Sequence, residues 1–325
     1  MGFSTMINAA LIGLGNIAWK YDARNKNAGF ALSQGGAMRA HPEVTLAGGC
    51  SPDAEDRAGF TQWSEGVPAF TTPDEMLKTL RPEFVGICSP TEFHFAHAKL
   101  CLESGVRLIW LEKPPATTAA ELRGLIDLAE REQSTVCVNY FRRYLPLYQR
   151  LRDALQAEIF GQCRLIRMLY SPGLARNGVH LLDQLFFLTG AEEHELLWVE
   201  RSNHSSPSFA LRLSTGHLVQ VAGSDLPYHS NDISAVCAKG ILSVLRGGKR
   251  VVLERRVENA LFPGLHELQD GDHTAFGDAS LEGYMKNALD DLLVASRTNV
   301  APQSNMRSAF RTQVLLEDIL GGSTL

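Results

Sequence analysis

Short apolar runs alternate with helical patterns along the first 140 residues of the chain. Capping signals mark two of the helices, because Thr72-Pro73-Asp74-Glu75 and the Thr118/Glu121 pair each provide an N-cap with a capping-box glutamate. This repeated β-α alternation predicts a doubly wound α/β domain whose parallel sheet is covered on both faces. The apolar runs that predict its strands lie at residues 7–12, 44–49, 67–70, 84–88, 107–111 and 135–138.

One segment, residues 20–36, breaks this alternation. It is polar, contains glycine and lacks the spacing of an amphipathic helix. We expect an inserted loop between the first and second strands. Both a lid over a site at the end of the first strand and a passive surface loop fit this pattern.

The pattern changes after residue 144. Residues 208–222 alternate between apolar and polar positions around a Thr215-Gly216 turn, and Lys239-Gly240 and Gly247-Gly248 provide further tight turns. Successive short strands with such turns predict an antiparallel sheet in an α+β domain. We therefore place a first domain at residues 1–143 and a second at 144–325. The second domain's expected strands lie at 163–170, 208–222, 233–238, 241–245 and 250–255, and its helices at 146–157, 178–188, 281–296 and 304–320.

Composition narrows the class of protein. The 325 residues are 45% hydrophobic and 21% charged, which is typical of a folded protein and enough for two domains. A net charge of −5 argues against a protein that binds nucleic acid by neutralising phosphates, and no apolar run is long enough to span a bilayer. The first residues lack the basic start of a secretory signal. The six cysteines form no CxxC pair, so we expect reduced, buried thiols in a cytoplasmic protein.

The first motif with chemical meaning is Gly13-Leu14-Gly15-Asn16-Ile17-Ala18, directly after the first strand. In a GxGxxA turn, the first glycine allows a tight bend, the second admits a pyrophosphate, and the small final residue allows close packing. The following backbone N–H groups then face the phosphates. The position after a first strand therefore predicts a dinucleotide site.

The end of the second strand bears on which dinucleotide binds. Ser51 stands where a ribose-binding carboxylate would select NAD, and a serine can hydrogen-bond either a hydroxyl or a phosphate. No Arg or Lys follows immediately to hold a 2′-phosphate, and Asp53 disfavours one. Both NAD and NADP stay open, with a lean to NAD.

Three more motifs follow strands of the first domain. Ser89-Pro90-Thr91-Glu92-Phe93-His94 follows the fourth strand, and we expect Thr91 to cap the next helix. Glu112-Lys113-Pro114 follows the fifth strand, and Asn139 to Tyr144 follow the sixth. Lys113 would thus stand at the carboxyl edge of the sheet, where partial burial and a cationic nicotinamide would lower its pKa. Taken alone, a lysine after a strand is usually a surface residue, and His94 with His97 does not make a metal site because no third ligand is present.

The last motif, Asn177-Gly178-Val179-His180-Leu181-Leu182-Asp183, lies in the second domain. His180 and Asp183 are three residues apart on one helix face, so Asp183 could orient the imidazole. A structural histidine on an apolar helix is the alternative.

Together and in this order, these five motifs resemble the glucose–fructose oxidoreductase / inositol dehydrogenase / rhizopine-catabolism family (Gfo/Idh/MocA). The resemblance implies an N-terminal Rossmann domain and a C-terminal domain with an open, mainly antiparallel sheet. It implies an NAD(P)-dependent dehydrogenase acting on a secondary alcohol of a sugar, polyol, sugar acid or nucleotide sugar. It also implies a homo-oligomer, a dimer or tetramer.

The same resemblance implies roles for single residues. Lys113 and His180 would be catalytic, with His180 taking the hydroxyl proton and Lys113 holding the oxygen or relaying the proton. The expected cofactor-binding residues are Gly13, Gly15, Asn16, Ile17, Ala18, Ser51, Ser89, Pro90, Thr91, His94, Glu112 and Asn139. The expected substrate-binding residues are Arg143, Arg176, Asn177 and Asp183, with no metal.

One position departs from the family pattern, because many members carry an aspartate where this chain has Arg176. The basic side chain suggests an anionic substrate, which an arginine fork can hold. Two other functions also remain open: a redox-assisted glycoside hydrolase or lyase with tightly bound NAD, and a non-catalytic dinucleotide-binding regulator.

Overall fold

The computed structural model describes residues 6–200, 202–277 and 280–321. The chain divides into two compact units: the first holds the described residues of Met1–Tyr144 and Glu282–Phe310, and the second holds those of Leu145–Leu281 and Arg311–Thr324. Each unit has its own sheet and its own apolar core. None of the helices in the described ranges has the length and hydropathy of a membrane-spanning segment.

The first unit is built on a six-stranded parallel sheet, as the sequence predicts, with strand order β3-β2-β1-β4-β5-β6. Its order reverses between β1 and β4, and open α/β sheets bind ligands at such a reversal, beyond the carboxyl ends of the strands. The strands are β1 Ile7–Ile12, β2 Val44–Cys50, β3 Ala69–Phe70, β4 Phe84–Ile87, β5 Leu108–Leu111 and β6 Thr135–Val138.

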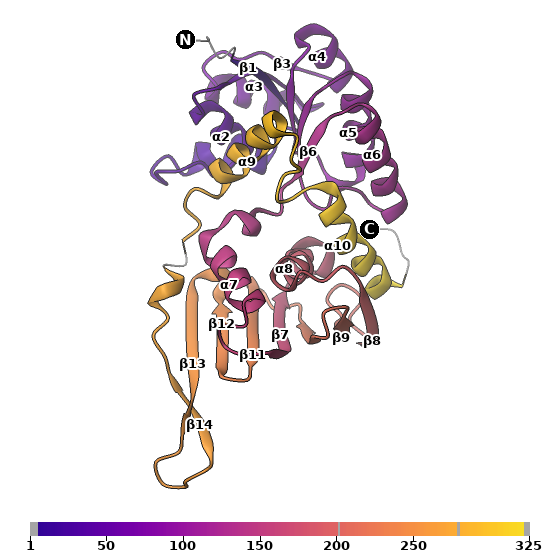
Figure 1. Cartoon of the computed structure of the whole chain (residues 1–325). Coiled ribbons are helices and arrows are strands. Elements are labelled where there is room, and N and C mark those ends of the chain that lie inside the picture. The colour runs from indigo at the N-terminus through magenta and orange to yellow at the C-terminus, as the bar shows by residue number, and fades with distance from the viewer. Residues whose placement is uncertain (1–5, 201, 278–279, 322–325) are drawn as a thin grey trace. The chain divides into compact units, whose positions relative to one another are not determined.

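Helices cover both faces of this sheet (Figure 1). Both predicted N-caps are confirmed: Thr72 Oγ1 accepts from Glu75 N at 3.3 Å, and Thr118 Oγ1 accepts from Glu121 N. The reciprocal capping box is confirmed at Thr118 and Glu121. The helices are α1 Tyr21–Arg24, α2 Gln34–Ala40, α3 Ala54–Trp63, α4 Pro73–Leu80, α5 His94–Glu103, α6 Ala119–Arg131 and α9 Tyr284–Thr298.

The predicted loop at residues 20–36 is wrong at both ends. A π-helical turn, Asn16–Lys20, runs directly into α1, and α2 already begins at Gln34. Short polar side chains replace the missing apolar periodicity: Ser33 Oγ caps α2 by accepting from Gly36 N, and Asp22 accepts from Leu32 N at 2.8 Å. The middle of the segment is irregular, and Asp22 fixes its far end.

Thr91 does not cap the following helix, contrary to expectation. It lies inside a 3₁₀ turn, Thr91–Phe93, and neither this turn nor α5 has a side-chain capping hydrogen bond. A capping hydroxyl must precede the first helical residue. Thr91 is already helical, so its hydroxyl is one position too late.

The second unit is built on an eight-stranded sheet with strand order β14-β13-β12-β11-β7-β10-β9-β8. All neighbouring pairs are antiparallel except β7 and β10, which run parallel, so the mainly antiparallel prediction is confirmed. The sequence did not predict β8 and β14, because their side chains are largely exposed and show no simple alternation. The strands are β7 Cys163–Ser171, β8 His194–Glu200, β9 Ser208–Leu213, β10 Leu218–Gly223, β11 Ser230–Cys237, β12 Gly240–Leu245, β13 Arg250–Glu258 and β14 His266–Asp270.

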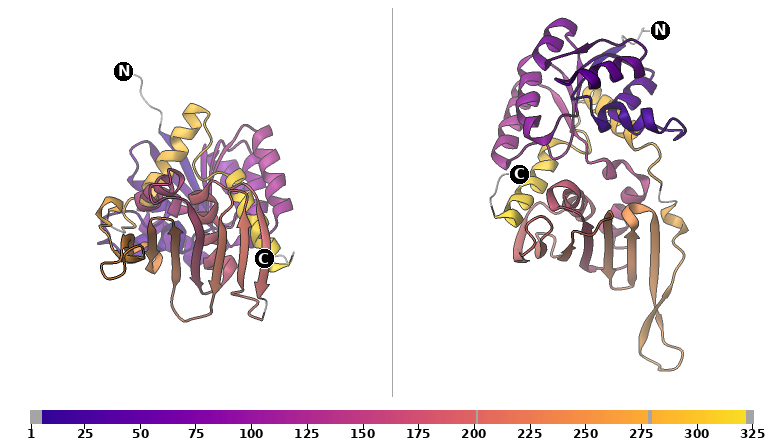
Figure 2. Two further views of the ribbon diagram at one scale, coloured as in Figure 1. Left: turned by 60° about the horizontal axis from the view of Figure 1, so that its bottom comes forward. Right: turned by 180° about the vertical axis from the view of Figure 1, so that it is seen from behind.

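Two helices of this unit, α7 (Pro146–Gln156) and α8 (Val179–Thr189), pack against each other on one face of the sheet (Figure 2). Alternate strand residues such as Ile166 and Met168 are buried, whereas Arg167 between them is exposed. Every residue of α8 is buried. The remaining helix, α10, covers Met306–Leu320.

Candidate active site

The loop after β1 leaves an open space beside its backbone. Gly13 has a φ of 85°, and a Cβ there would lie 2.6 Å from the backbone nitrogen of Ser89. A larger residue at this position would therefore push the β1 and β4 loops apart. Gly15 has an extended backbone, and a Cβ there would meet no described atom within 4 Å. This space fits a pyrophosphate, which approaches the backbone of such a loop where a side chain would otherwise stand.

We call the open space beside Gly15 the cradle, and the residues after Gly15 extend it. Asn16 is exposed and accepts from Arg24 Nη1 at 3.2 Å, and Ile17 is half-buried. Ala18 is fully buried, which lets the turn pack closely on the sheet. Asn16 and Ile17 thus lie at the start of the π-helical turn, in the position expected of cofactor-binding residues.

His94 connects the loops after β4 and β5. Its Nε2 lies 2.7 Å from Ser89 O and its Nδ1 lies 2.7 Å from Pro114 O, while the ring is 1% exposed. His94 therefore fixes the backbones that carry the predicted cofactor residues Ser89, Pro90 and Thr91. Whether it also touches the cofactor stays a prediction.

Glu112 lies at the centre of a buried polar cluster at the end of β5. Its Oε1 accepts from Gln34 Nε2 at 2.9 Å and from Asn139 Nδ2 at 2.5 Å. Burial raises the pKa of Glu112, whereas these amide donors and the positive charge of Lys113 act in the opposite direction. Glu112 thus places a negative charge or a hydrogen-bond acceptor beside the half-buried Lys113.

Two oxygens of this cluster have no partner within the described residues. Asn139 Oδ1 and Gln34 Oε1 are buried and unsatisfied, and a buried unpaired acceptor costs about 1–3 kcal/mol. Asn139 is 2% exposed and follows β6, at the same sheet edge as Lys113 after β5. A ligand amide or hydroxyl at this edge would satisfy such acceptors, which supports Asn139 as a ligand-binding residue.

The end of β2 holds a cation that the sequence analysis missed. Arg57 Nη1 donates to Ser51 O at 2.7 Å and to Pro52 O at 2.8 Å. Arg57 is six positions after Ser51 in the sequence, but the first turn of α3 brings its side chain back to the end of the strand. Asp53, expected to repel a phosphate, caps α3 by accepting from two backbone N–H groups, which lower its pKa. No Arg or Lys follows Ser51 immediately in the sequence, but the fold brings Arg57 back to the end of β2. The lean to NAD stays a prediction.

The second unit carries the other predicted site residues. His180 and Asp183 are 7% and 1% exposed on the first turns of α8. The Nδ2 of Asn177 donates to two backbone carbonyl oxygens, Ser171 O and, at 3.1 Å, Ser230 O. The Asn177 amide therefore fixes the turn before α8. Arg176, on the same turn, is exposed.

The predicted substrate residue Arg143 belongs to the first unit. It is 5% exposed, and its Nη1 donates to Gln303 O at 2.9 Å while Gln303 Nε2 donates back to Arg143 O at 2.7 Å. This exchange ties Arg143 to the connection between α9 and α10.

Four further polar residues were not found from the sequence. Gln34 and Arg57 act through folded contacts with Glu112 and Ser51, so no local motif marks them. Gln184 on α8 and Asn231 on β11 are 0% and 2% exposed, and both ends of each amide lack a partner within the described part of the chain. A glutamine next to Asp183 in a largely apolar helix was the available signal for Gln184.

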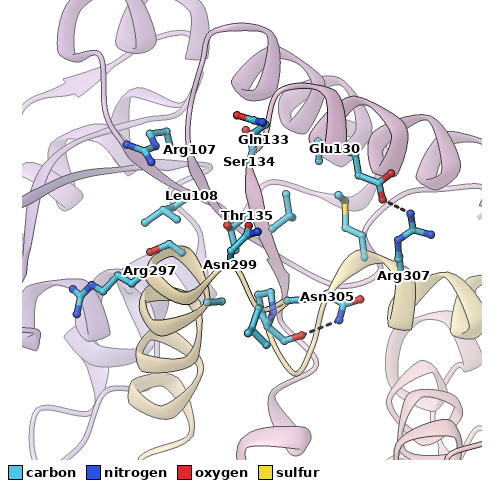
Figure 3. A pocket seen from close by; sticks show the side chains of 18 of the residues that line it. Arg107, Leu108, Glu130, Gln133, Ser134, Thr135, Arg297, Asn299, Asn305 and Arg307 are labelled. Carbon is cyan, nitrogen blue, oxygen red and sulfur yellow. Dashed lines mark hydrogen bonds and ion pairs between the residues drawn. The ribbon is translucent and has the colours of Figure 1, made fainter.

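A separate cavity of about 860 Å³ lies at the opposite edge of the first unit's sheet (Figure 3). Its walls include Leu108 and Thr135 at the starts of β5 and β6, and residues of α6 and α9. Arg307 pairs with Glu130 across its rim. Ligands of open α/β sheets bind at the carboxyl ends of the strands. The cavity is therefore distinct from the cradle beside Gly15.

Comparison with known proteins gives the following matches. Residues 7–140 match the family model described as "Oxidoreductase family, NAD-binding Rossmann fold", GFO_IDH_MocA. The chain is 24% identical over 211 residues to D-glucoside 3-dehydrogenase of Escherichia coli (strain K12), a stretch covering 58% of this chain and 55% of that protein. The chain thus spans about half the length of the curated relatives it matches.

Solved structures match over nearly the whole chain. A dehydrogenase from Chromobacterium violaceum has a TM-score of 0.78 at 18% identity, covering 98% of this chain and 95% of that one. KijD10, a 3-ketoreductase from Actinomadura kijaniata solved with TDP-benzene and NADP, has a TM-score of 0.75 at 16% identity, covering 98% of each chain. At these identities the likeness concerns the fold of both units.

Proposed function

We propose that the chain is an NAD(P)-dependent dehydrogenase of the Gfo/Idh/MocA oxidoreductase family, because residues 7–140 match the model of that family's NAD-binding Rossmann domain. Its reaction would be hydride transfer between the nicotinamide and a secondary alcohol of a sugar, polyol, sugar acid or nucleotide sugar. Relatives named for a glucoside, a nucleotide sugar and inositol support this substrate class.

The observation that carries the proposal is the gathering of four strand ends at one edge of the first sheet. The cradle beside Gly15 follows β1, Ser89 follows β4, Lys113 follows β5 and Asn139 follows β6. These four strands are neighbours in the sheet, in the order β1-β4-β5-β6. A dinucleotide lying along this edge would place its pyrophosphate at Gly15 and its nicotinamide half toward β5 and β6.

The chain's own residues would then bind and orient the substrate and transfer its proton. The cofactor, when bound, supplies or takes the hydride. Lys113 would hold the carbinol oxygen through its ammonium, and the neighbouring Glu112 would place a negative charge or a hydrogen-bond acceptor beside that ammonium. His180 would take the hydroxyl proton as the alcohol becomes a carbonyl, and Asp183 would orient the imidazole.

The test is turnover of a carbohydrate panel by the purified chain with each dinucleotide. The panel holds hexoses, inositols, sugar acids and nucleotide sugars, and the readout is reduced nicotinamide against product. A dehydrogenase forms reduced cofactor in proportion to product. Product without reduced cofactor would instead identify a redox-assisted hydrolase or lyase. Dinucleotide binding without turnover of any compound would identify a regulator, and absence of binding would overturn the proposal.

Arg57 gives a prediction about the choice between NAD and NADP. Its guanidinium lies over the end of β2, where the adenosine ribose would bind. We expect Arg57→Ala to weaken NADP binding by about tenfold or more, because a charge-assisted hydrogen bond contributes about 1.5–3 kcal/mol. Binding of NAD would change little.

The measurement is the Kd of each dinucleotide by fluorescence titration. Arg39→Ala is the matched control, because Arg39 pairs with Glu65 on the outside of α2. Equal weakening of NAD and NADP would show that Arg57 only supports the loop after β2.

Arg176 gives a prediction about substrate charge. It is exposed on the π-helical turn that ends two residues before His180, and a guanidinium is a side chain that binds anionic groups. Arg176→Ala should lower kcat/KM for a sugar acid or nucleotide sugar by about tenfold, and change a neutral sugar much less. An unchanged kcat/KM for the acidic substrate would count against this role.

A further inference from the structure

Two cysteines of the second unit lie opposite each other on neighbouring strands. Cys163 begins β7, Cys237 ends β11, and the antiparallel register pairs these two residues directly. A register shift between Val236 and Cys237 adjoins the pair. In a regular antiparallel ladder, opposite residues have Cα atoms about 4.5–5.5 Å apart, within the range of about 4.4–6.8 Å that a disulfide spans. Both thiols are free in this structure.

A third side chain completes this cluster. His217 lies in the turn before β10, the strand that pairs with β7 on its other side. Its Nδ1 lies 2.8 Å from Thr215 Oγ1. The neighbouring Cys237 thiol and, to a smaller extent, the His217 imidazole lower the pKa of Cys163, against the effect of its burial. The same pairing raises the pKa of Cys237.

The other four cysteines have the opposite environment. Burial raises the pKa of each of these thiols, to about 12 for Cys50 and Cys137, and upward for Cys88 and Cys101 as well. Each of them is buried, as is Cys163, which is 8% exposed, whereas Cys237 is half-buried and gives access to the pair. Reactivity with oxidants follows thiolate character and exposure. Cys163 is therefore set apart from the other four buried thiols by its lowered pKa and by the half-buried Cys237 opposite it.

We propose that Cys163 and Cys237 form a reversible oxidation site for peroxides, with Cys163 as the attacking sulfur and Cys237 as the resolving thiol. In the first step, the Cys163 thiolate attacks hydrogen peroxide, an S–O bond forms, the O–O bond breaks, and the departing hydroxide leaves as water after taking a proton. In the second step, the Cys237 sulfur attacks the sulfenic acid, an S–S bond forms, the S–O bond breaks, and a second water leaves. Sulfur is oxidised and peroxide is reduced, and a dithiol reductant reverses the result.

The experiment treats the full chain with limiting hydrogen peroxide and maps each cysteine by alkylation and mass spectrometry. The cross-linked peptide pair of Cys163 and Cys237 should be about 2 Da lighter than the reduced pair, because two hydrogens are lost. These two thiols should disappear at least about tenfold faster than Cys101, the internal control, and dithiothreitol should restore them.

Three variants separate the roles. Cys237→Ser should leave a sulfenic acid at Cys163 that dimedone traps, and Cys163→Ser should leave Cys237 reduced. His217→Gln should slow the loss of the Cys163 thiol severalfold, because it removes a group that stabilises the thiolate. Equal oxidation of all six cysteines, a cross-link between other partners, or no reaction of the pair would overturn the proposal. The test needs no cofactor or substrate, so its outcome is independent of the proposed dehydrogenase activity.

Discussion

Replacement of Lys113 by alanine should lower kcat by about 10²–10⁴-fold, the usual contribution of a general acid–base group. The side chain is half-buried directly after β5, and its charge acts on the neighbouring buried Glu112. Removal of the ammonium leaves the carbinol oxygen without its cation and removes a charge that holds the pKa of Glu112 down. Dinucleotide affinity should change little, because the cradle beside Gly15 remains.

The measurements are kcat on a substrate found in the carbohydrate panel and Kd for the dinucleotide. Lys99→Ala is the matched control, since Lys99 pairs with Glu103 on the exposed side of α5. Lys113→Arg separates charge from proton transfer: an arginine keeps the positive charge and does not give up a proton near neutral pH. Near-normal turnover by Lys113→Ala would remove this residue from the catalytic assignment.

The fold of the first unit could be predicted closely because its signals are local. Continuous apolar runs mark strands buried on both faces, and Thr72 and Thr118 mark helix starts through hydrogen bonds to residues three positions away. The helical ends of the segment at 20–36 were missed, because they are held by Asp22 and Ser33 rather than by an apolar face. The strand β14 was missed because all of its residues are exposed.

The candidate site likewise contains residues that local sequence signals predict and residues that only the folded contacts reveal. Its glycines, Lys113 and Asn139 could be found because each follows a strand, and parallel strands bring their carboxyl ends to one edge. Gln34 and Arg57 could not be found, because their contacts with Glu112 and Ser51 form only when the helices that carry them pack beside the strand ends. The pairing of Cys163 with Cys237 is likewise a matter of register between strands far apart in the sequence, which no spacing in the chain shows.

Gly15→Val should abolish dinucleotide binding while leaving the fold intact. The geometry of the loop after β1 supports both expectations. The backbone of Gly15 is extended, which a β-branched residue adopts readily, and a Cβ there meets no described atom within 4 Å. The free protein should therefore unfold at nearly the same temperature as the unaltered chain. The new side chain would occupy the space of the pyrophosphate, so Kd should rise at least about a hundredfold, or about 2.7 kcal/mol.

The neighbouring glycine provides the contrast that makes this test specific. Gly13→Ala would place a Cβ 2.6 Å from the Ser89 backbone at a φ of 85°, so it should lower the thermal stability before any cofactor is added. Gly124→Ala, on the helix α6 with its nearest neighbour 4.0 Å away, should leave the dinucleotide affinity unchanged and raise the thermal stability slightly, because alanine favours a helix interior over glycine by about 1 kcal/mol. Thermal unfolding and fluorescence titration of the three variants distinguish a blocked cradle from a damaged loop. Retained dinucleotide affinity in a folded Gly15→Val protein would show that the cofactor does not lie beside this glycine.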